Sequence, residues 1–200
     1  MNTMRNQQSG FTLVETLIAI FILALTIGAL LTLTAGGFFS IRYAKNDIVA
    51  SNLLQESLEF IRNSRDSAAQ RDITWDQWKQ QFATCFDDTG CVINPYAPED
   101  TLDFVASCNE NRVRGGANDC SPLIYLQDQG LYVQGDLASV FETTGIDIQT
   151  SFIRNIFFED ITTTPTNPQL RVSARMDWKN GTNPKNLTQS IILTPWNINQ

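Results

Sequence analysis

The side chains with the most definite chemistry in this 200-residue chain are four cysteines. Cysteine thiolates either bind a soft metal such as Zn²⁺ or oxidise in pairs to disulfides. Zinc sites made of thiolates use cysteines two to four residues apart, and this chain lacks that spacing, so disulfides are favoured. Four cysteines allow three connectivities, and the shortest loops favour Cys85 with Cys91 and Cys108 with Cys120.

Catalytic and metal-binding constellations are otherwise sparse. The chain contains no histidine, the most frequent general base and metal ligand. Asp88-Thr89-Gly90 matches the aspartic protease tripeptide, but that reaction needs two carboxylates and there is no second copy. We therefore expect no enzyme, no metal and no cofactor. A group of oxygen-bearing residues could ligate calcium but lacks EF-hand spacing, which favours a solvated loop: Asp100, Asp103, Asn109, Glu110, Asn118 and Asp119.

Glu15 is a carboxylate near the start of an apolar run that covers residues 11–39. The run exceeds the ~20 residues that a helix needs to cross a bilayer. A charged side chain costs ~2.5 to 3.5 kcal/mol near a bilayer centre and less toward the interface, so the position of Glu15 needs a reason. A secretory signal with a cut near Ala35 has too long a run, and a plain signal anchor does not explain the acid.

The string GFTLVETLIAIFILAL, preceded by a short polar leader, resembles the N-terminal signature of type IV pilins and type II secretion pseudopilins. The resemblance implies that a prepilin peptidase cleaves between Gly10 and Phe11, that the Phe11 amine is methylated, and that the helix is retained. The following stretch, SIRYAKNDIVASNLLQESLEFIRNSRDSA, resembles minor pilins of the type IV pilus modification (PilV-like) class.

The same resemblance implies partners and a location. The partners are other pilins or pseudopilins in a filament, the prepilin peptidase, an inner-membrane assembly platform, and membrane lipid before assembly. The chain is expected in the cytoplasmic membrane, with its head on the extracytoplasmic side, and in an extracellular filament. Thiols on that side are normally oxidised, which agrees with disulfides.

The role of Glu15 can be argued from charge alone. After cleavage, the Phe11 amine is cationic and lies one helical turn from Glu15, or faces it from a neighbouring helix. A buried carboxylate is penalised unless it is paired, so an incoming amine makes docking favourable and sets the axial register. We therefore interpret Glu15 as an assembly residue. The alternative is a side chain that reaches water at the cytoplasmic interface.

These residues require a long helix and a head, and we expect three segments: a cleaved leader (1–10), a membrane or filament-core half of the helix (11–39) and an exported head (40–200). Apolar periodicity extends the helix to about Asn63. Gly36-Gly37 predicts a bend or local melting. The outer half is amphipathic, and its predicted buried face is Ala44, Ile48, Ser51, Leu54, Leu58 and Ile61.

The remaining chain predicts an α+β head in which the helix packs across an antiparallel sheet of about four strands. A short helix is expected to Phe82, capped by Thr74 or Asp72, and is followed by loops over residues 83–122. A three-residue hairpin turn is expected at Asp128-Gln129-Gly130. Strands are expected over 151–161, 170–178 and 187–194, and the second alternates apolar and polar residues.

The net charge is −7, which disfavours a nucleic-acid partner. Arg112 and Arg114 could contact DNA phosphates, but solvated side chains are the simpler interpretation. The leading hypothesis is a minor pilin-like structural subunit of a type IV pilus or related filament. The alternatives are a minor pseudopilin of a type II secretion system, a competence or adhesive pilin with a ligand-binding head, and, least favoured, an anchored enzyme.

Overall fold

The computed structural model describes residues 12–96, 105–108, 120, 122–134, 147–164 and 167–196. The chain divides into two compact units, Met1–Lys45 and Asn46–Gln200, and helix α1 (Leu13–Gln70) contributes residues to both. The predicted fold class is confirmed: a long apolar N-terminal helix is combined with antiparallel sheets and two disulfides. The described strands form a five-stranded and a three-stranded sheet, whereas one sheet of about four strands was expected.

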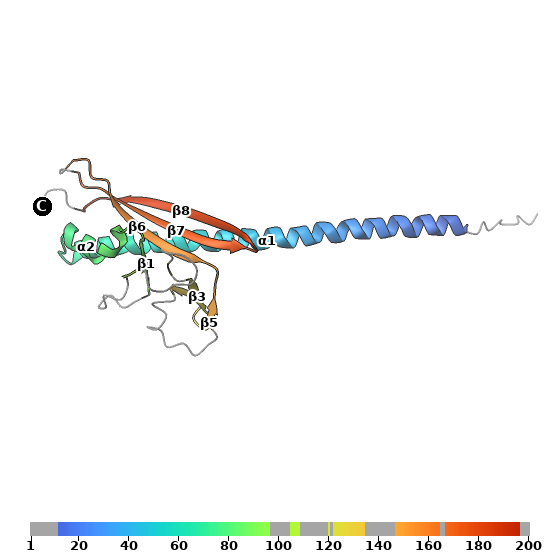
Figure 1. The fold of residues 1–200 in the computed structure, drawn as a ribbon, viewed down its shortest axis with the longest axis horizontal. Helices are drawn as coiled ribbons and strands as arrows, with labels where there is room; N and C mark the ends of the chain where they lie inside the picture. The colour runs from blue at the N-terminus through green and yellow to red at the C-terminus, as the bar shows by residue number, and fades with distance from the viewer. Residues whose placement is uncertain are drawn as a thin grey trace, which may run out of the picture. The chain divides into compact units, whose positions relative to one another are not determined.

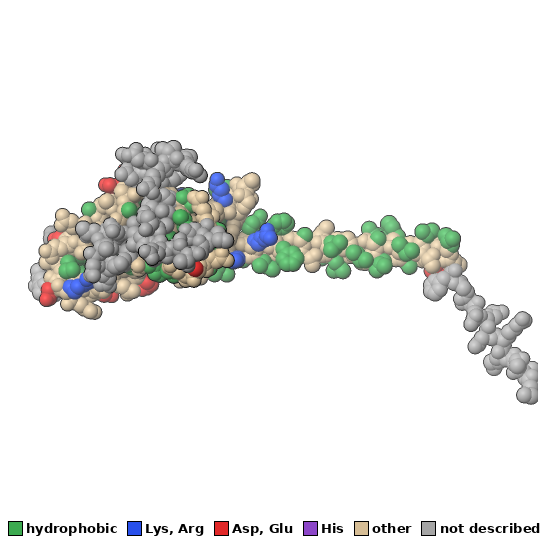
Figure 2. All heavy atoms as spheres, turned by 90° about the horizontal axis from the view of Figure 1, so that it is seen from below, with side chains coloured by type: hydrophobic (Ala, Val, Ile, Leu, Met, Phe, Trp, Pro, Cys, Tyr) green, Lys and Arg blue, Asp and Glu red, His purple; other side chains and the backbone are tan. Residues whose placement is uncertain are grey.

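In the first unit, α1 leaves its apolar side chains uncovered (Figure 2). Leu13 is 74% exposed and Leu33 is 72% exposed. The threonine hydroxyls within this stretch donate to carbonyl oxygens three or four residues earlier, for example Thr26 to Leu23 at 2.8 Å. Such internal bonds satisfy the polar atoms of a helix without water, as a lipid environment requires.

The glycine pair does not interrupt the helix. Residues 36 and 37 remain α-helical, so the expected local melting is not found there. Helix α1 also runs beyond Asn63, to Gln70. It ends where Asp72 adopts a positive φ of 56° and the Ile73 N–H bonds the Ala68 carbonyl at 3.1 Å, the pattern of a Schellman cap. Asp72 therefore closes α1 rather than opening the next helix.

The second unit is built around the outer part of α1 and the five-stranded sheet, in the order β2-β1-β6-β7-β8 (Figure 1). The strands are β1 (Cys91–Ile93), β2 (Val105–Ser107), β6 (Ile153–Asp160), β7 (Leu170–Asn180) and β8 (Asn183–Leu193). All pairings are antiparallel. Strands β1 and β2 lie where only loops were expected, because three-residue strands carry almost no periodic signal.

The buried face of α1 differs in part from the predicted one. Leu54, Leu58 and Ile61 are buried as expected, but Ile48 is 60% exposed and Ala50 is fully buried. The remaining buried positions of α1 are Leu53, Ser57 and Ala68. A helix face wide enough for a sheet takes in adjacent positions such as 53 and 54, so periodicity alone does not locate its edges.

The hairpin formed by β7 and β8 runs alongside α1. Asn46 Nδ2 donates to Asn180 Oδ1 at 2.8 Å, and Gln189 Nε2 donates to Ser51 Oγ at 3.2 Å. Strand β7 alternates as predicted, with its apolar residues buried and its arginines exposed. The hairpin turn therefore lies at the end of the unit where α1 begins within it.

Helix α2 (Trp75–Gln81) is capped by Thr74, whose side chain accepts from the Gln77 N–H, while Gln77 bonds back to Thr74. A 3₁₀ turn, η1 (Ala83–Phe86), follows. Trp78 and Phe82 are fully buried, and Phe82 stacks on Phe158 with ring centroids 5.0 Å apart. This aromatic cluster closes the core beside the sheet.

The three-stranded sheet has the order β4-β3-β5. Its strands are β3 (Leu123–Leu126), β4 (Leu131–Gln134) and β5 (Asp147–Gln149). The hairpin between β3 and β4 has four loop residues rather than three, since Leu126 pairs with Leu131. Gly130 takes the left-handed conformation with φ +71°, as its place in the turn requires.

Candidate functional site: the apolar helix and its carboxylate

The candidate site begins at the first turn of α1. Thr12 precedes the helix, and its Oγ1 accepts the Glu15 N–H at 3.3 Å. Its carbonyl accepts the Thr16 N–H at 3.2 Å. These bonds identify Thr12 as the N-cap. The proposed cleavage residues, Gly10 and Phe11, lie outside the described residues.

The Glu15 carboxylate lies in the first turn of α1 among exposed apolar side chains. Among the described residues it has no ion-pair or hydrogen-bond partner. The pattern Thr12-x-x-Glu15 is also the sequence signature of a capping box. The interpretation of Glu15 as an assembly residue did not use this signal. The structure contains the Thr12 half of that motif, and the carboxylate is left open to a partner from outside.

The helix that carries this carboxylate is long and apolar enough to cross a membrane, and it is the one helix of the described residues that meets this test. Signal sequences near an N-terminus meet the same criteria of length and composition. The residues around the helix therefore decide how it is interpreted. The acid four residues after Phe11, at the start of the run, distinguishes this segment from an ordinary anchor.

The sequence around this site matches a family model. Residues 5–31 match the prokaryotic N-terminal methylation motif. This motif indicates a type IV pilin-like prepilin. The matched residues include Gly10, Phe11 and Glu15. No curated protein matches the chain, and no solved structure matches it.

The motif gives the apolar helix a coherent interpretation. The motif suggests processing by a prepilin peptidase and assembly with other pilins into a filament. An exposed apolar helix fits both membrane anchoring and a filament core.

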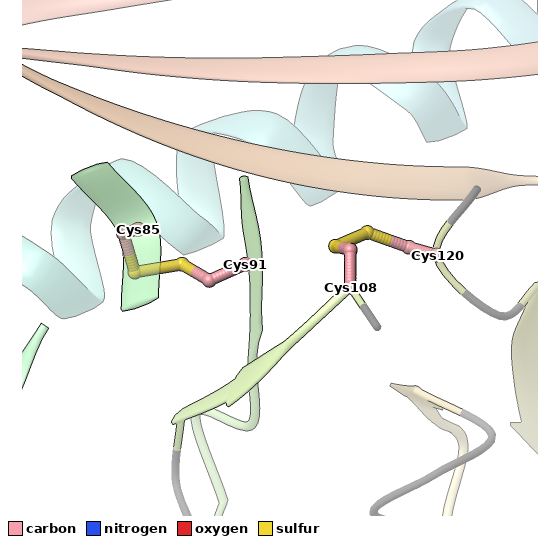
Figure 3. Close-up of a disulfide and its surroundings, with 4 residues drawn as sticks. All are labelled: Cys85, Cys91, Cys108 and Cys120. Atoms are coloured by element: carbon pink, nitrogen blue, oxygen red, sulfur yellow. A yellow bond between two sulfur atoms is a disulfide. The ribbon is translucent and has the colours of Figure 1, made fainter. Parts of the chain in front are cut away.

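The second unit contains two disulfides, Cys85–Cys91 and Cys108–Cys120, the pairing favoured from loop length (Figure 3). Cys85 lies in η1 and Cys91 in β1, while Cys108 directly follows β2. All four are almost completely buried. Because their sulfur atoms are bonded to one another, they offer no thiolates to zinc. The disulfides attach the short strands β1 and β2 to their surroundings.

A charged network that sequence reasoning missed connects α1 to the sheet. Arg154 of β6 is fully buried, and its Nη2 donates to the Ile93 carbonyl at 2.9 Å. Its Nη1 lies 3.4 Å from Glu56 Oε2, and the Tyr96 hydroxyl donates to Glu56 Oε1. Burial lowers the pKa of Arg154 against the opposing effect of Glu56. Burial, followed by the bond to Glu56, raises the pKa of Tyr96 to about 12.

The sequence contained a signal for this network. Arg154 shares the inward face of β6 with Ile156 and Phe158, because strand side chains alternate. A cation at an inward position requires a partner, although the sequence does not say that Glu56 supplies it. The network is a structural link between helix and sheet.

The smaller motifs have structural explanations or cannot be placed. Asp88-Thr89-Gly90 lies in a turn closed by the Gly90 N–H on the Asp87 carbonyl at 2.9 Å. Two strings fit the N-x-T glycosylation pattern: Asn180-Gly-Thr182 lies at the end of the β7–β8 hairpin, and Asn186-Leu-Thr188 lies within β8. Within the described ranges no group of His, Cys, Asp or Glu could hold a metal. Several candidates lie outside those ranges: Asp100, Asp103, Asn109, Glu110, Arg112, Arg114, Asn118 and Asp119.

Proposed function

We propose that this protein is a minor pilin-like subunit of a type IV pilus or a related filament. The observation that carries the proposal is the exposed apolar first part of α1, with a single open carboxylate at Glu15 inside the methylation motif. Cleavage between Gly10 and Phe11 creates a cationic amine next to that helix. The subunit then enters the filament through the helix and displays its head.

The docking step is a charge pairing in an apolar environment. The Phe11 amine of an incoming subunit meets the Glu15 carboxylate of a subunit already in place, and each removes the desolvation penalty of the other. Apolar contact along the helix supplies affinity without strong positional preference. The ion pair adds a fixed axial register, which a helical filament needs.

A minor subunit of the PilV-like class is favoured by the resemblance of residues 40–68 to that class. The oxidised cysteines support a head on the extracytoplasmic side, where disulfides persist. A minor pseudopilin of a type II secretion system shares the N-terminal segment and the same docking chemistry. The proposed division is a leader at 1–10, an embedded helix at 11–39 and an exported head at 40–200.

The first test is the intact mass and N-terminal residue of the chain co-expressed with a prepilin peptidase. A catalytically inactive peptidase is the control. We expect a methylated Phe11 as the N-terminus with the active enzyme and an uncleaved chain with the inactive one. An uncleaved chain in both cases would leave a signal-anchored protein, and a cut near Ala35 would leave a secreted one. Either result would contradict the filament role.

The second test distinguishes a subunit of a pilus from a subunit of a secretion system. The gene is deleted from a strain that carries both a pilus and a secretion system, and surface filaments and secreted enzymes are measured separately. Loss of filaments or of their function with normal secretion supports the pilus assignment. The reverse result assigns the chain to the secretion system.

A further inference from the structure

Strand β8 forms one edge of the five-stranded sheet, and no other described strand lies beyond it (Figure 1). Its 11 residues make it much longer than the opposite edge, the three-residue strand β2. In an antiparallel pair, alternate residues direct their N–H and C=O groups away from the partner strand. Among the hydrogen bonds of the described residues, none joins these groups of β8 to anything outside the hairpin. The outer edge of β8 therefore presents a row of backbone donors and acceptors to a partner.

Most of this edge lacks the features that prevent strands from pairing. Natural sheets protect long edges with charged side chains, proline or a bulge. Strand β8 has such residues only where it begins, at Pro184 and Lys185. Residues 186–193 contain neither a charge nor a proline, and their register with β7 runs on without a bulge. This part of the edge is therefore suited to pairing with a further strand.

A groove of about 520 Å³ lies between this edge and helix α1. Its lining comes from both elements: Gln55, Leu58 and Glu59 of α1, and residues 189–191 of β8. A strand added to β8 would direct alternate side chains toward α1, because the side chains of a strand alternate between its two faces. The groove would receive those side chains. The edge and the groove thus fit the same occupant, an extended peptide.

The exposure of Ile48 supports this occupant. Ile48 has the spacing of a core residue but is 60% exposed. It lies one helical turn before Ser51, whose Oγ accepts a hydrogen bond from Gln189 Nε2 at 3.2 Å. It also lies two turns before Gln55, on the side of α1 that lines the groove. An added strand would cover Ile48, so its core spacing is explained by a sheet with one more strand.

The charges beside the edge indicate the chemistry of the partner. Lys185 lies on the same face of β8 as Gln189, the face toward α1. It is exposed and forms no ion pair with any described residue, whereas Glu59 is paired with Arg62. A complementary segment therefore has an acid opposite Lys185 and uncharged residues along the groove. A second copy of β8 does not meet this requirement, because the strand contains no acid.

We propose that the free edge of β8 binds an extended segment of a different protein as a sixth strand of the sheet. The segment is uncharged along the groove and acidic where it passes Lys185. The inference goes beyond the filament role and does not depend on it, because every contact that it uses lies within the second unit.

The test uses the full-length chain in detergent micelles and fluorescent peptides about eight residues long, a usual strand length. The first peptide alternates threonine and valine and has an aspartate at each end. The second has lysines in place of the aspartates. The third is the aspartate peptide with alternate backbone nitrogens methylated, so that one edge cannot donate hydrogen bonds. Fluorescence anisotropy measures affinity, and hydrogen–deuterium exchange locates the protected amides.

We expect the aspartate peptide to bind and to slow amide exchange in β8. The methylated peptide should bind about tenfold more weakly or worse, because it cannot complete the ladder. Lys185→Glu should weaken the aspartate peptide about threefold and strengthen the lysine peptide by a similar factor, as expected for an exposed ion pair. Gln55→Trp, which fills the groove from an exposed position, should lower the affinity about tenfold.

Two matched variants serve as controls and should bind like the parent. Lys179→Glu makes the same charge change on the other face of the same hairpin, and Asn63→Trp places the same bulk at an exposed position of α1 outside the groove. Thermal melts verify that each variant is folded.

Three results would overturn the proposal. If the methylated and unmodified peptides do not differ, including the case that neither binds, the edge does not accept a strand. Equal responses of Lys185→Glu and Lys179→Glu would remove the requirement for an acid. Protection of β8 that rises with the concentration of the chain, without any peptide, would assign the edge to a second copy.

Discussion

The two parts of helix α1 satisfy the hydrophobic effect in different ways. From Leu13 to Ile41 its large apolar side chains are exposed, with Leu17 59% and Leu30 63% accessible. Within the second unit, Leu54 and Ile61 of the same helix are fully buried against the sheet. The second part is stabilised by its own chain, whereas the first requires lipid or other subunits to cover it.

This difference teaches that assembly and stability are separable in this protein. Substitutions in the first unit should change where the subunit goes while the head stays folded. Substitutions in the second unit should change the stability of the head while processing and membrane insertion stay normal. A substitution that changed both assembly and the stability of the head would contradict this separation.

The largest expected effect is on Glu15. Glu15→Val should remove the carboxylate that receives the incoming amine, so incorporation into sheared filaments should fall below detection on immunoblots. Processing and the thermal midpoint of the head should not change. The control is Glu59→Val, which removes an exposed acid of α1 in the second unit. Normal filament incorporation of the Glu15 variant would refute the assembly role.

The next effect is on the network around Arg154. Glu56→Ala leaves a fully buried guanidinium without its carboxylate and should lower the free energy of unfolding by on the order of 3 kcal/mol. The value lies at the low end for buried pairs because the Glu56 side chain is 28% exposed. Urea unfolding followed by tryptophan fluorescence measures it. Arg154→Met/Glu56→Leu should recover most of the loss, and a double variant as unstable as Glu56→Ala would falsify the pairing energy.

Each disulfide should contribute as much as this network or slightly less. The separations of 6 and 12 residues correspond to losses of about 2 and 3 kcal/mol for Cys85→Ser/Cys91→Ser and Cys108→Ser/Cys120→Ser, from loop-closure entropy. Thermal melts with and without reductant provide the measurement. Reductant should lower the midpoint of the parent and leave a chain without both disulfides unchanged. If the reductant reduces both disulfides completely and the melting midpoint of the parent chain does not change, the prediction is wrong.

The smallest effect is at the cap of α2. Thr74→Ala removes the acceptor for the Gln77 N–H and should cost about 1 kcal/mol, whereas Thr74→Ser should be nearly neutral. Chemical denaturation of the three proteins under identical conditions compares them. Equal stability of the alanine and serine variants would show that the capping box contributes nothing.

Much of the fold could be predicted from local patterns. The apolar run, the alternation of β7 and the cap at Thr74 are each written within a short stretch of chain. The assembly hypothesis for Glu15 likewise depends on neighbouring residues alone. The predictions for the helix, the strand and the cap are confirmed, because these elements display their pattern in consecutive residues. The hypothesis for Glu15 stays a prediction.

Local patterns failed where a boundary or a partner lies far away in the chain. Ile48 has the spacing of a core residue and is exposed, while the three-residue strands β1 and β2 exist because neighbours pair with them. The residue that closes α1 is Asp72, which reads equally well as the start of the next helix.

The sequence by itself determined the processing motif, the membrane-capable helix and an oxidised α+β head. Only the tertiary structure decided that Arg154 meets Glu56, and that Asn46 bonds Asn180 at the end of the β7–β8 hairpin. The physical reason is range. Composition and periodicity act between neighbours in the chain. Pairing of residues 98 or 134 positions apart depends on how the sheet and the helix pack, which no short stretch records.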